Sequence, residues 1–215
     1  MAVFDDCGDD CCRCNSCREL CWCLLCVAIL AAVALVVVLV AAFAFVRHAD
    51  ITVDDASLTR LALVTTPTTA FAYNLSLTLT IRNPNWAMGM ANTKPLEAAY
   101  RFDDQQFDRV RLAGEGDRHA AGKTRVYRLA SGAAAAAVSL GNAGVAEFRR
   151  ENATGTFEVE VVVTGEVKYT ARAAKCRIEA SCPLKLQLAP PGQAAPAALV
   201  FQKVKCKLAK AENNC

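Results

Sequence analysis

Thiols are the most reactive groups in this chain, and eight of its twelve cysteines fall within the first 26 residues. They are Cys7, Cys11, Cys12, Cys14, Cys17, Cys21, Cys23 and Cys26. Their spacings suit zinc held by thiolates, and the run from Cys11 to Cys21 matches the C-x2-C-x2-C-x3-C pattern of bacterial iron–sulfur ferredoxins. No proline follows Cys21, and no folded scaffold is expected around the run, so we expect no iron–sulfur cluster.

An adjoining apolar segment gives these thiols a simpler chemistry. Cysteines beside the cytosolic face of a membrane are substrates for S-acylation. The candidates for S-acylation are Cys11, Cys12, Cys14, Cys17, Cys21 and Cys23. A zinc site, which would make the tail a metal sensor, and plain reduced thiols are the alternatives.

The other four cysteines, Cys176, Cys182, Cys206 and Cys215, are candidates for disulfides. Cys176 and Cys182 share one face of a predicted strand about 20 Å apart, so they cannot pair with each other without a sharp bend. Cys206 could pair with either from a neighbouring strand, and Cys215 could link two chains. Buried free thiols at Cys176 and Cys206 are the alternative.

Residues suited to catalysis are sparse. The two histidines are His48, beside the apolar segment, and His119, in a polar loop, and neither belongs to a nucleophile–base arrangement. The carboxylates at positions 103, 104, 158 and 160 fit solvated turn or strand positions. The sequence contains no Gly-rich phosphate loop and no HExxH motif. We therefore expect no enzyme, no cofactor and no catalytic metal.

Lys203, Lys205 and Lys207 fall on one face of a predicted strand over residues 199–208, with ammonium groups about 6.6 Å apart. Such a face could hold a lipid headgroup or an acidic wall polymer such as pectin. Protection of a sheet edge against unwanted pairing explains the lysines equally well. The net charge is only +3, and the sequence contains no dense basic patch. We therefore expect no nucleic-acid partner.

These groups are positioned by a membrane helix and a β-rich domain. Residues 20–46 are 27 consecutive uncharged residues, whereas a membrane span needs about 20 and a cleavable signal has an apolar stretch of about 7–15. We therefore expect a retained transmembrane helix over 20–46, with Trp22 at the interface. A Cys-rich tail (1–19) precedes it and one folded domain (47–215) follows.

Two glycosylation sequons and the candidate disulfides suggest the orientation. The sequons, Asn74-Leu-Ser76 and Asn152-Ala-Thr154, lie in the large domain together with the four later cysteines. The arginines on the two sides of the helix do not decide its direction. We expect the domain to lie outside the cell and the tail in the cytosol.

Alternating apolar and polar residues predict β-structure through most of the domain. The clearest strands are expected at 75–82, 156–169 and 175–188, with weaker ones at 57–64, 96–102, 107–112 and 124–129. Gly165 is expected to mark a bulge or bend. Residues 131–152 predict a short helix or helical loop. Seven or eight short strands with one helix are typical of an antiparallel β-sandwich of the immunoglobulin/fibronectin-III type.

The motif Asn83-Pro84-Asn85 follows the first of these strands and suits a turn. Asn83 can accept from a backbone N–H two residues on, Pro84 restricts φ, and Asn85 tolerates a left-handed conformation. A direct binding role is the alternative.

With this motif the chain resembles the plant family of harpin-induced and non-race-specific disease resistance membrane proteins. These carry the late-embryogenesis-abundant subgroup 2 domain, also called the water-stress and hypersensitive-response domain. The resemblance includes the Cys-rich tail, the anchor, LTLTIRNPN, KCRIEASCPLKL and FQKVKCKL. It implies a non-enzymatic plasma-membrane protein of defence or stress responses, with its domain in the apoplast.

The chain departs from the family at two motifs. The usual tyrosine pair after the NPN turn is absent, and Ala113-Gly114-Glu115-Gly116 replaces Pro-Phe-Tyr-Gln-Gly. Partner specificity is therefore not transferred. Two functions stay open: an interaction module that binds a protein partner, a second copy or a wall polymer, and a structural protector of membranes or proteins under abiotic stress.

Overall fold

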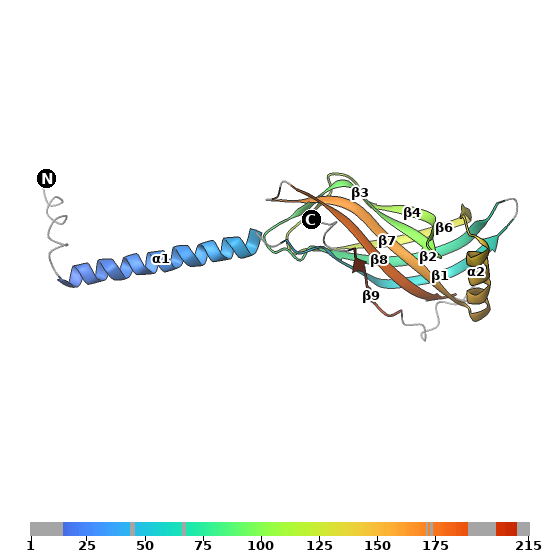
Figure 1. Cartoon of the computed structure of the whole chain (residues 1–215), viewed down its shortest axis with the longest axis horizontal. Helices are drawn as coiled ribbons and strands as arrows, with labels where there is room; N and C mark the ends of the chain where they lie inside the picture. Colours follow the sequence, from blue (N-terminus) through green and yellow to red (C-terminus); the bar gives the residue numbers. More distant parts are fainter. Residues whose placement is uncertain are drawn as a thin grey trace. The chain divides into compact units, whose positions relative to one another are not determined.

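The computed structural model of the chain describes residues 15–43, 46–65, 68–170, 172, 174–188 and 201–209. The chain divides into two compact units, Met1–Val46 and Arg47–Cys215. The first contains a single described helix, and the second contains two β-sheets and a helix (Figure 1).

Helix α1 spans Asn15–Phe43 and contains the apolar segment. Its 24 residues from Leu20 to Phe43 are long and apolar enough to cross a membrane, with a mean hydropathy of 3.4. All side chains from residue 20 to residue 41 are exposed, as a lipid-facing helix requires. The predicted span ended at Val46, but Val46 is not helical, and residues 44–45 lie outside the described part.

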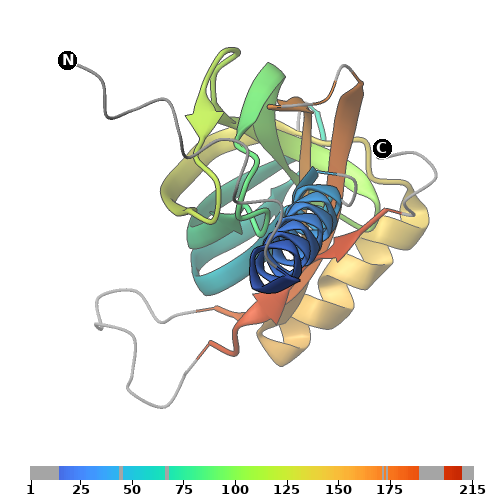
Figure 2. The same ribbon diagram turned by 90° about the vertical axis from the view of Figure 1, so that its left-hand side faces the viewer.

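The second unit confirms the predicted antiparallel sandwich. One sheet has the strand order β6-β2-β1-β9, and the other has the order β10-β8-β7-β3-β4 with β5 beside β3. The strands are β1 (Asp50–Val64), β2 (Ala70–Arg82), β3 (Met90–Phe102), β4 (Gln105–Ala113), β5 (Arg118–His119), β6 (Thr124–Ala137), β7 (Thr156–Tyr169), β8 (Lys175–Gln187), β9 (Val204–Lys205) and β10 (Lys207–Leu208). Strands β3, β7 and β8 take the places of strands C, F and G of an immunoglobulin-type sandwich. Figure 2 looks along the strands and separates the two layers.

Six strands have 13 to 15 residues. Of these, β1, β2, β3 and β6 are longer than predicted, β7 has the predicted bounds, and β8 ends one residue before the predicted position. In β1 the pairing with β2 is irregular between Val53 and Asp55 and again between Leu58 and Arg60. An irregularity of this kind shifts the alternation of buried and exposed side chains. The period-two pattern therefore identified only residues 57–64 of this strand.

Strand β3 begins at Met90, before Pro95, whereas the predicted strand began after this proline, at Leu96. Its pairing with β7 shifts register between Lys94 and Glu97, and a bulge is one of the places where a sheet accepts proline. Gly165 of β7 lies against this bulge, because a Cβ on Gly165 would stand 2.7 Å from Leu96 Cδ1 and 3.4 Å from Leu96 Cα. The bulge predicted at Gly165 is therefore in the neighbouring strand, and the pairing of β7 with β8 continues without a shift.

Helix α2 spans Asn142–Thr154, so only the second half of the predicted segment 131–152 is helical. The alanine run 133–137 belongs to β6 and pairs with β2. This sheet pairing outweighs the helical propensity of alanine. Phe148 of α2 is buried, with its ring centroid 5.6 Å from those of Phe71 and Phe157. The helix covers the end of the sandwich opposite the start of β1 (Figure 1).

Aromatic rings from both sheets fill the core near α2. Phe71 packs edge-to-face on Phe102 and Phe107 at centroid distances of 5.5 and 5.4 Å, and Tyr73 packs on Phe107 at 5.1 Å. The Tyr73 hydroxyl donates to a carboxylate oxygen of Asp108. Burial of such rings contributes more to stability than that of smaller apolar side chains, because each removes about 150–250 Å² from water.

Replacing Gly165 by alanine tests the tight contact between β7 and the β3 bulge. We expect Gly165→Ala to lower the free energy of unfolding by about 1–3 kcal/mol, because the new methyl group must displace the buried Leu96 side chain. The measurement is denaturant unfolding of the detergent-solubilised chain. Gly114→Ala is the matched control, since its Cβ would meet only Asp117 Oδ2 at 3.7 Å. Equal stability of the two variants would contradict the expectation.

Candidate functional site

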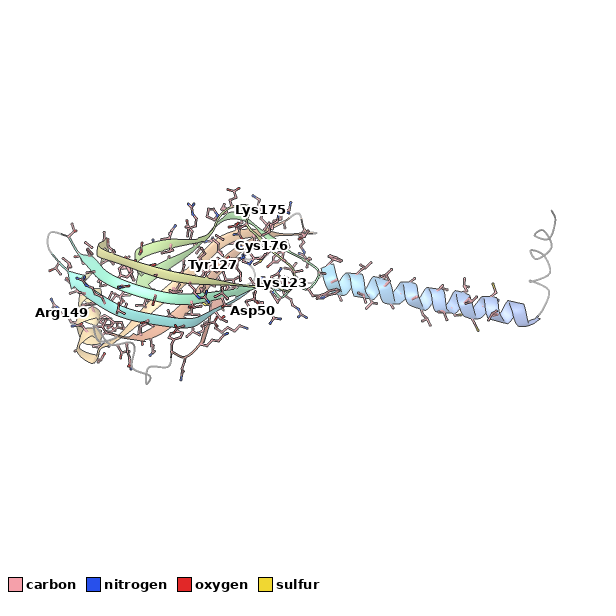
Figure 3. The ribbon with its side chains drawn as sticks, turned by 180° about the vertical axis from the view of Figure 1, so that it is seen from behind. Asp50, Lys123, Tyr127, Arg149, Lys175 and Cys176 are labelled. Atoms are coloured by element: carbon pink, nitrogen blue, oxygen red, sulfur yellow. A yellow bond between two sulfur atoms is a disulfide. The ribbon has the colours of Figure 1, made fainter. Side chains whose placement is uncertain are left out.

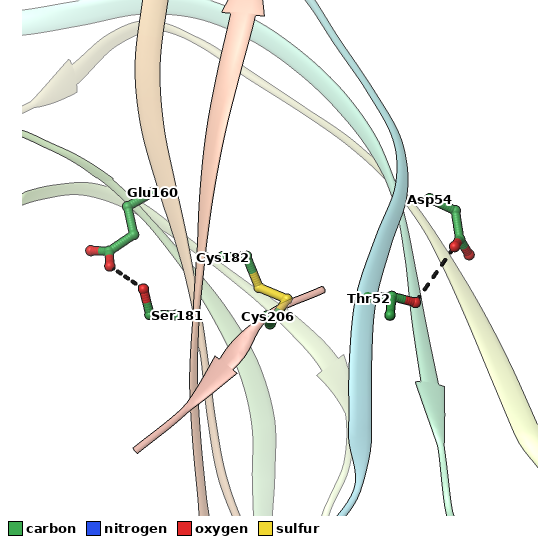
Figure 4. Close-up of a disulfide and its surroundings, with 6 residues drawn as sticks. All are labelled: Thr52, Asp54, Glu160, Ser181, Cys182 and Cys206. Atoms are coloured by element: carbon green, nitrogen blue, oxygen red, sulfur yellow. Dashed lines mark hydrogen bonds between the residues drawn. A yellow bond between two sulfur atoms is a disulfide. The ribbon is translucent and has the colours of Figure 1, made fainter. Parts of the chain in front are cut away.

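The C-terminal segment crosses from one sheet to the other along the side of the sandwich. Strand β9 pairs with β1, and β10 pairs with β8. Between them, the Cys206 N–H donates to the carbonyl of Ile51 at 3.0 Å, and its sulfur is bonded to that of Cys182 on β8 (Figure 4). The single predicted strand over 199–208 is therefore two short strands, because the chain changes sheets at Cys206.

Two of the three predicted surface lysines are paired with acids on β1. Lys203 Nζ is 2.6 Å from Asp54 Oδ1, and Lys205 Nζ is 3.2 Å from Asp50 Oδ1. The hydrogen bond from Lys203, followed by one from Thr80, holds the pKa of Asp54 below its usual value. Lys207 is exposed. The arrangement favours the protective role at the edge of β1 over a free basic face.

The pairing of Cys182 with Cys206 is one of the two that the sequence left open. Cys176 is disulfide-bonded as well. The alternative of buried free thiols is therefore wrong for Cys176 and Cys206. Cys215 lies outside the described residues.

Three of the eight N-terminal cysteines lie on α1 as free, exposed thiols, namely Cys21, Cys23 and Cys26. Helix α1 begins at Asn15, so Cys17 is helical too. The remaining candidates for acylation or metal binding, Cys7, Cys11, Cys12 and Cys14, lie outside the described residues. For these the choice between acylation, zinc and free thiols stays a prediction.

Both sequon asparagines are exposed. Asn74 lies on β2 between the buried Tyr73 and Leu75, on the polar face that the alternation predicted. Asn152 is exposed on α2. Both side chains are accessible to a glycan.

Asn83 and Asn85 form a buried hydrogen-bonded clamp, and their exposed fractions are 0% and 4%. The Asn85 N–H donates to Asn83 Oδ1 at 3.1 Å, which is the predicted turn contact. Asn83 Nδ2 donates to the carbonyls of Met88 at 2.8 Å and Ala120 at 3.3 Å. Asn85 Nδ2 donates to the Arg47 carbonyl at 2.7 Å, and the Arg47 N–H donates back to Asn85 Oδ1 at 2.8 Å.

The clamp joins three segments that are distant in sequence. The Asn83 N–H donates to the Lys123 carbonyl at 3.0 Å, and the Gly122 N–H donates to the Asn85 carbonyl at 2.8 Å. Asn85 does not adopt the left-handed conformation that we considered, since Asp103 and Asp104 are the non-glycine residues with positive φ in the described chain. The amide groups are used inside the protein, which supports the turn-forming role over direct binding.

We call the end of the sandwich around this clamp the stem end, made of residues 47–49, 82–89 and 118–125. Trp86 lies directly after the clamp and is 64% exposed. These segments contain five arginines or lysines and no aspartate or glutamate: Arg47, Arg82, Arg118, Lys123 and Arg125. In Figure 3, Lys123 lies near Asp50 at the start of β1, whereas Arg149 lies at the opposite end. Trp86 was not predicted as a surface residue of interest, although its position directly after the NPN turn was a signal in the sequence.

An acidic depression lies at the α2 end. Six carboxylates line it with Arg101 and Lys185: Asp103, Asp104, Glu147, Glu151, Glu158 and Glu160. Lys185 pairs with Glu158 at 2.7 Å, and Arg150 pairs with Glu147. Burial raises the pKa of Glu151, whose carboxylate accepts from the Glu158 N–H at 3.1 Å. Within the described ranges no three His, Cys, Asp or Glu side chains form a metal site.

His119 is buried in β5, although a polar loop was predicted. Its Nε2 lies 3.2 Å from the Tyr127 hydroxyl. Burial lowers the pKa of His119, and the positive charge of Arg125 lowers it further. The contact joins β5 to β6 through a histidine–phenol hydrogen bond.

The comparisons with known proteins add little. No protein-family model and no curated protein matches the chain. A solved structure entitled "Crystal structure of protein from Archaeoglobus fulgidus" is similar over 63% of this chain and 98% of its own, at 8% identity and a TM-score of 0.30. That likeness carries no functional argument.

Changing Asn83 to aspartate tests the clamp. We expect Asn83→Asp to destabilise the domain by about 3 kcal/mol or more, because a buried carboxylate would face the carbonyls of Met88 and Ala120 without a hydrogen to donate. Thermal unfolding followed by circular dichroism measures the effect. Asn74→Asp, at an exposed position, is the control and should unfold like the wild type in unglycosylated protein. A wild-type midpoint for Asn83→Asp would exclude the clamp.

The lowered pKa of His119 predicts loss of stability in acid. The unfolded chain takes up a proton near pH 6.5 that the folded chain resists, so the free energy of unfolding falls as the pH drops from 7 toward 5. One such group contributes at most about 1.4 kcal/mol per pH unit. Denaturant unfolding at several pH values should show a shallower slope for His119→Gln. A slope that is unchanged by His119→Gln but removed by His48→Gln would contradict this assignment.

Proposed function

We propose that the chain is a non-enzymatic, single-pass plasma-membrane protein whose β-sandwich lies outside the cell and acts as an interaction module in defence or stress responses. The observation that carries the proposal is the Cys182–Cys206 disulfide in a domain that follows a helix able to span a membrane.

Disulfides persist in oxidising compartments and are rare in the cytosol. Cys182 and Cys206 come from strands of one folded domain, and Cys176 is bonded too. An extracellular location explains both bonds. It also leaves the tail cysteines on the cytosolic side, where S-acylation takes place.

The open edge of β6 supports an interaction role. β6 has 14 residues and is the last strand of its sheet; 12 of them pair with β2, and no further strand of the described chain is hydrogen-bonded to its other edge. Residues 129–137 of this edge carry no charge. An unprotected edge is a template for strand addition, so a protein partner or a second copy of the chain is the proposed ligand.

A polyanionic ligand is the weaker choice of partner, since Asp54 and Asp50 balance Lys203 and Lys205. The alternative function is a structural protector of membranes or proteins under abiotic stress. A protector of this kind depends on abundance, whereas an interaction module depends on one surface. The paired lysines give the protector hypothesis some support, because they stabilise the fold instead of offering a ligand site.

Glycosylation mapping tests the proposed orientation. We expect the protein expressed in plant cells to lose apparent mass on treatment with a glycosidase that accepts plant glycans, and we expect Asn74→Gln and Asn152→Gln each to remove part of this shift, because both asparagines are exposed. The measurement is gel mobility, with the double variant as control. If no shift appears, protease protection of sealed vesicles decides the orientation. In sealed microsomes, whose lumen corresponds to the outside of the cell, digestion of the domain by added protease without detergent would show a cytosolic domain and overturn the proposal.

A further inference from the structure

We propose that the stem end of the sandwich is a lipid-docking surface that sits on the phospholipid headgroups beside the membrane span. Trp86 inserts at the interface, and the surrounding arginines and lysines face lipid phosphates. This inference rests on the membrane span of the proposed function but goes beyond it, because a span alone does not require the domain to touch the bilayer.

The length of chain between the two units keeps the stem end near the membrane. Only residues 44–46 separate Phe43, the last residue of α1, from Arg47. Four residue steps cover at most about 14 Å. The α1 segment from Leu20 measures about 36 Å, which exceeds the hydrocarbon core of about 30 Å, so its end reaches the headgroup layer.

The clamp holds Trp86 close to Arg47, so the short connection to α1 limits the distance of Trp86 from the membrane as well. Asn85 holds the backbone of Arg47 through two hydrogen bonds, of 2.7 and 2.8 Å, and Trp86 is the next residue. The buried Met88 and the bond from Asn83 to its carbonyl hold the other side of the turn. The position of Trp86 relative to the start of the domain is therefore set by the fold.

Exposure and chemistry then favour lipid as the partner of Trp86. It is the large apolar residue of the second unit with the greatest exposure in the described chain, at 64%. Tryptophan concentrates at membrane interfaces, where its ring is buried at headgroup level and its N–H stays hydrated. A water-exposed indole on a rigid turn next to a span fits that location.

Charge distinguishes the two ends of the sandwich. The three segments of the stem end contain five basic residues and no acid, and of the two acids that flank them in sequence, Asp50 and Asp117, Asp50 is paired with Lys205. The depression at the α2 end is instead lined mainly by carboxylates. A basic surface is attracted to the phosphate groups of lipid headgroups, and more strongly where anionic lipids are present. The difference in charge between the two ends therefore favours the stem end as the face toward lipid.

The two tryptophans of the chain allow each part to be tested separately. Trp22→Phe leaves Trp86 as the reporter, and Trp86→Phe leaves Trp22 in α1. Each full-length variant is reconstituted into vesicles of phosphatidylcholine and phosphatidylglycerol, with or without lipids spin-labelled at the headgroup. We expect the emission of Trp86 to be lower in vesicles with labelled lipids than in the same vesicles without them, because an indole at headgroup level lies beside the label.

Three outcomes decide the inference. Quenching of both tryptophans by labelled lipids supports docking. Quenching of Trp22, by headgroup or acyl-chain labels, without any quenching of Trp86 overturns docking and leaves the span intact. If neither headgroup nor acyl-chain labels quench Trp22, the span fails, and the proposed function fails with it.

A charge-reversal pair tests the basic component. Lys123→Glu at the stem end and Arg149→Glu on α2 change the net charge equally, and both residues are exposed at opposite ends of the domain (Figure 3). In the Trp22→Phe background we expect Lys123→Glu to reduce the quenching of Trp86 and Arg149→Glu to leave it unchanged. Equal effects of the two changes would overturn the role of the stem-end charges.

Discussion

The covalent and hydrogen-bonded crossing at Cys206 is the constraint on which the domain depends. Its sulfur is bonded to Cys182 of β8, while its N–H donates to Ile51 of β1, so one residue joins the two sheets. In the chain-entropy model, closing a loop of this size stabilises a domain by about 3 kcal/mol, a sizeable share of the usual net stability. The same bond restricts the compartment in which the domain is stable.

At the stem end, hydrogen bonds take the place of the covalent link. The side chains of Asn83 and Asn85 satisfy the backbone groups of three segments at the point where the chain enters the domain. Buried amides without partners would be costly, and here the donors and acceptors are matched. The result is a hydrogen-bonded turn that carries the exposed Trp86 directly after Asn85.

Much of the fold was predictable because period-two alternation is strong in β2, β7 and β8. The sequence did not reveal the full length of β1 and β3, whose bulges interrupt the alternation. It also misassigned the alanine run 133–137, because pairing with β2 decides its conformation and this is a tertiary effect. For the site, the contact within the NPN turn was predicted, and the pairing of Cys182 with Cys206 was one of two possibilities. Trp86 and the acids that pair with the lysines were missed. The pairing of Lys203 with Asp54 joins residues that are far apart in sequence, and no local pattern encodes it.

The redox state of Cys182 and Cys206 in the cell is the most direct test of the central claim. Cells that express the full-length protein are treated with a membrane-permeant alkylating agent under denaturing conditions, and labelled peptides are identified by mass spectrometry before and after reduction. The account predicts that both cysteines stay unlabelled until the disulfide is reduced. Complete labelling of Cys182 and Cys206 without reduction would show a reduced, cytosolic domain and would contradict the account.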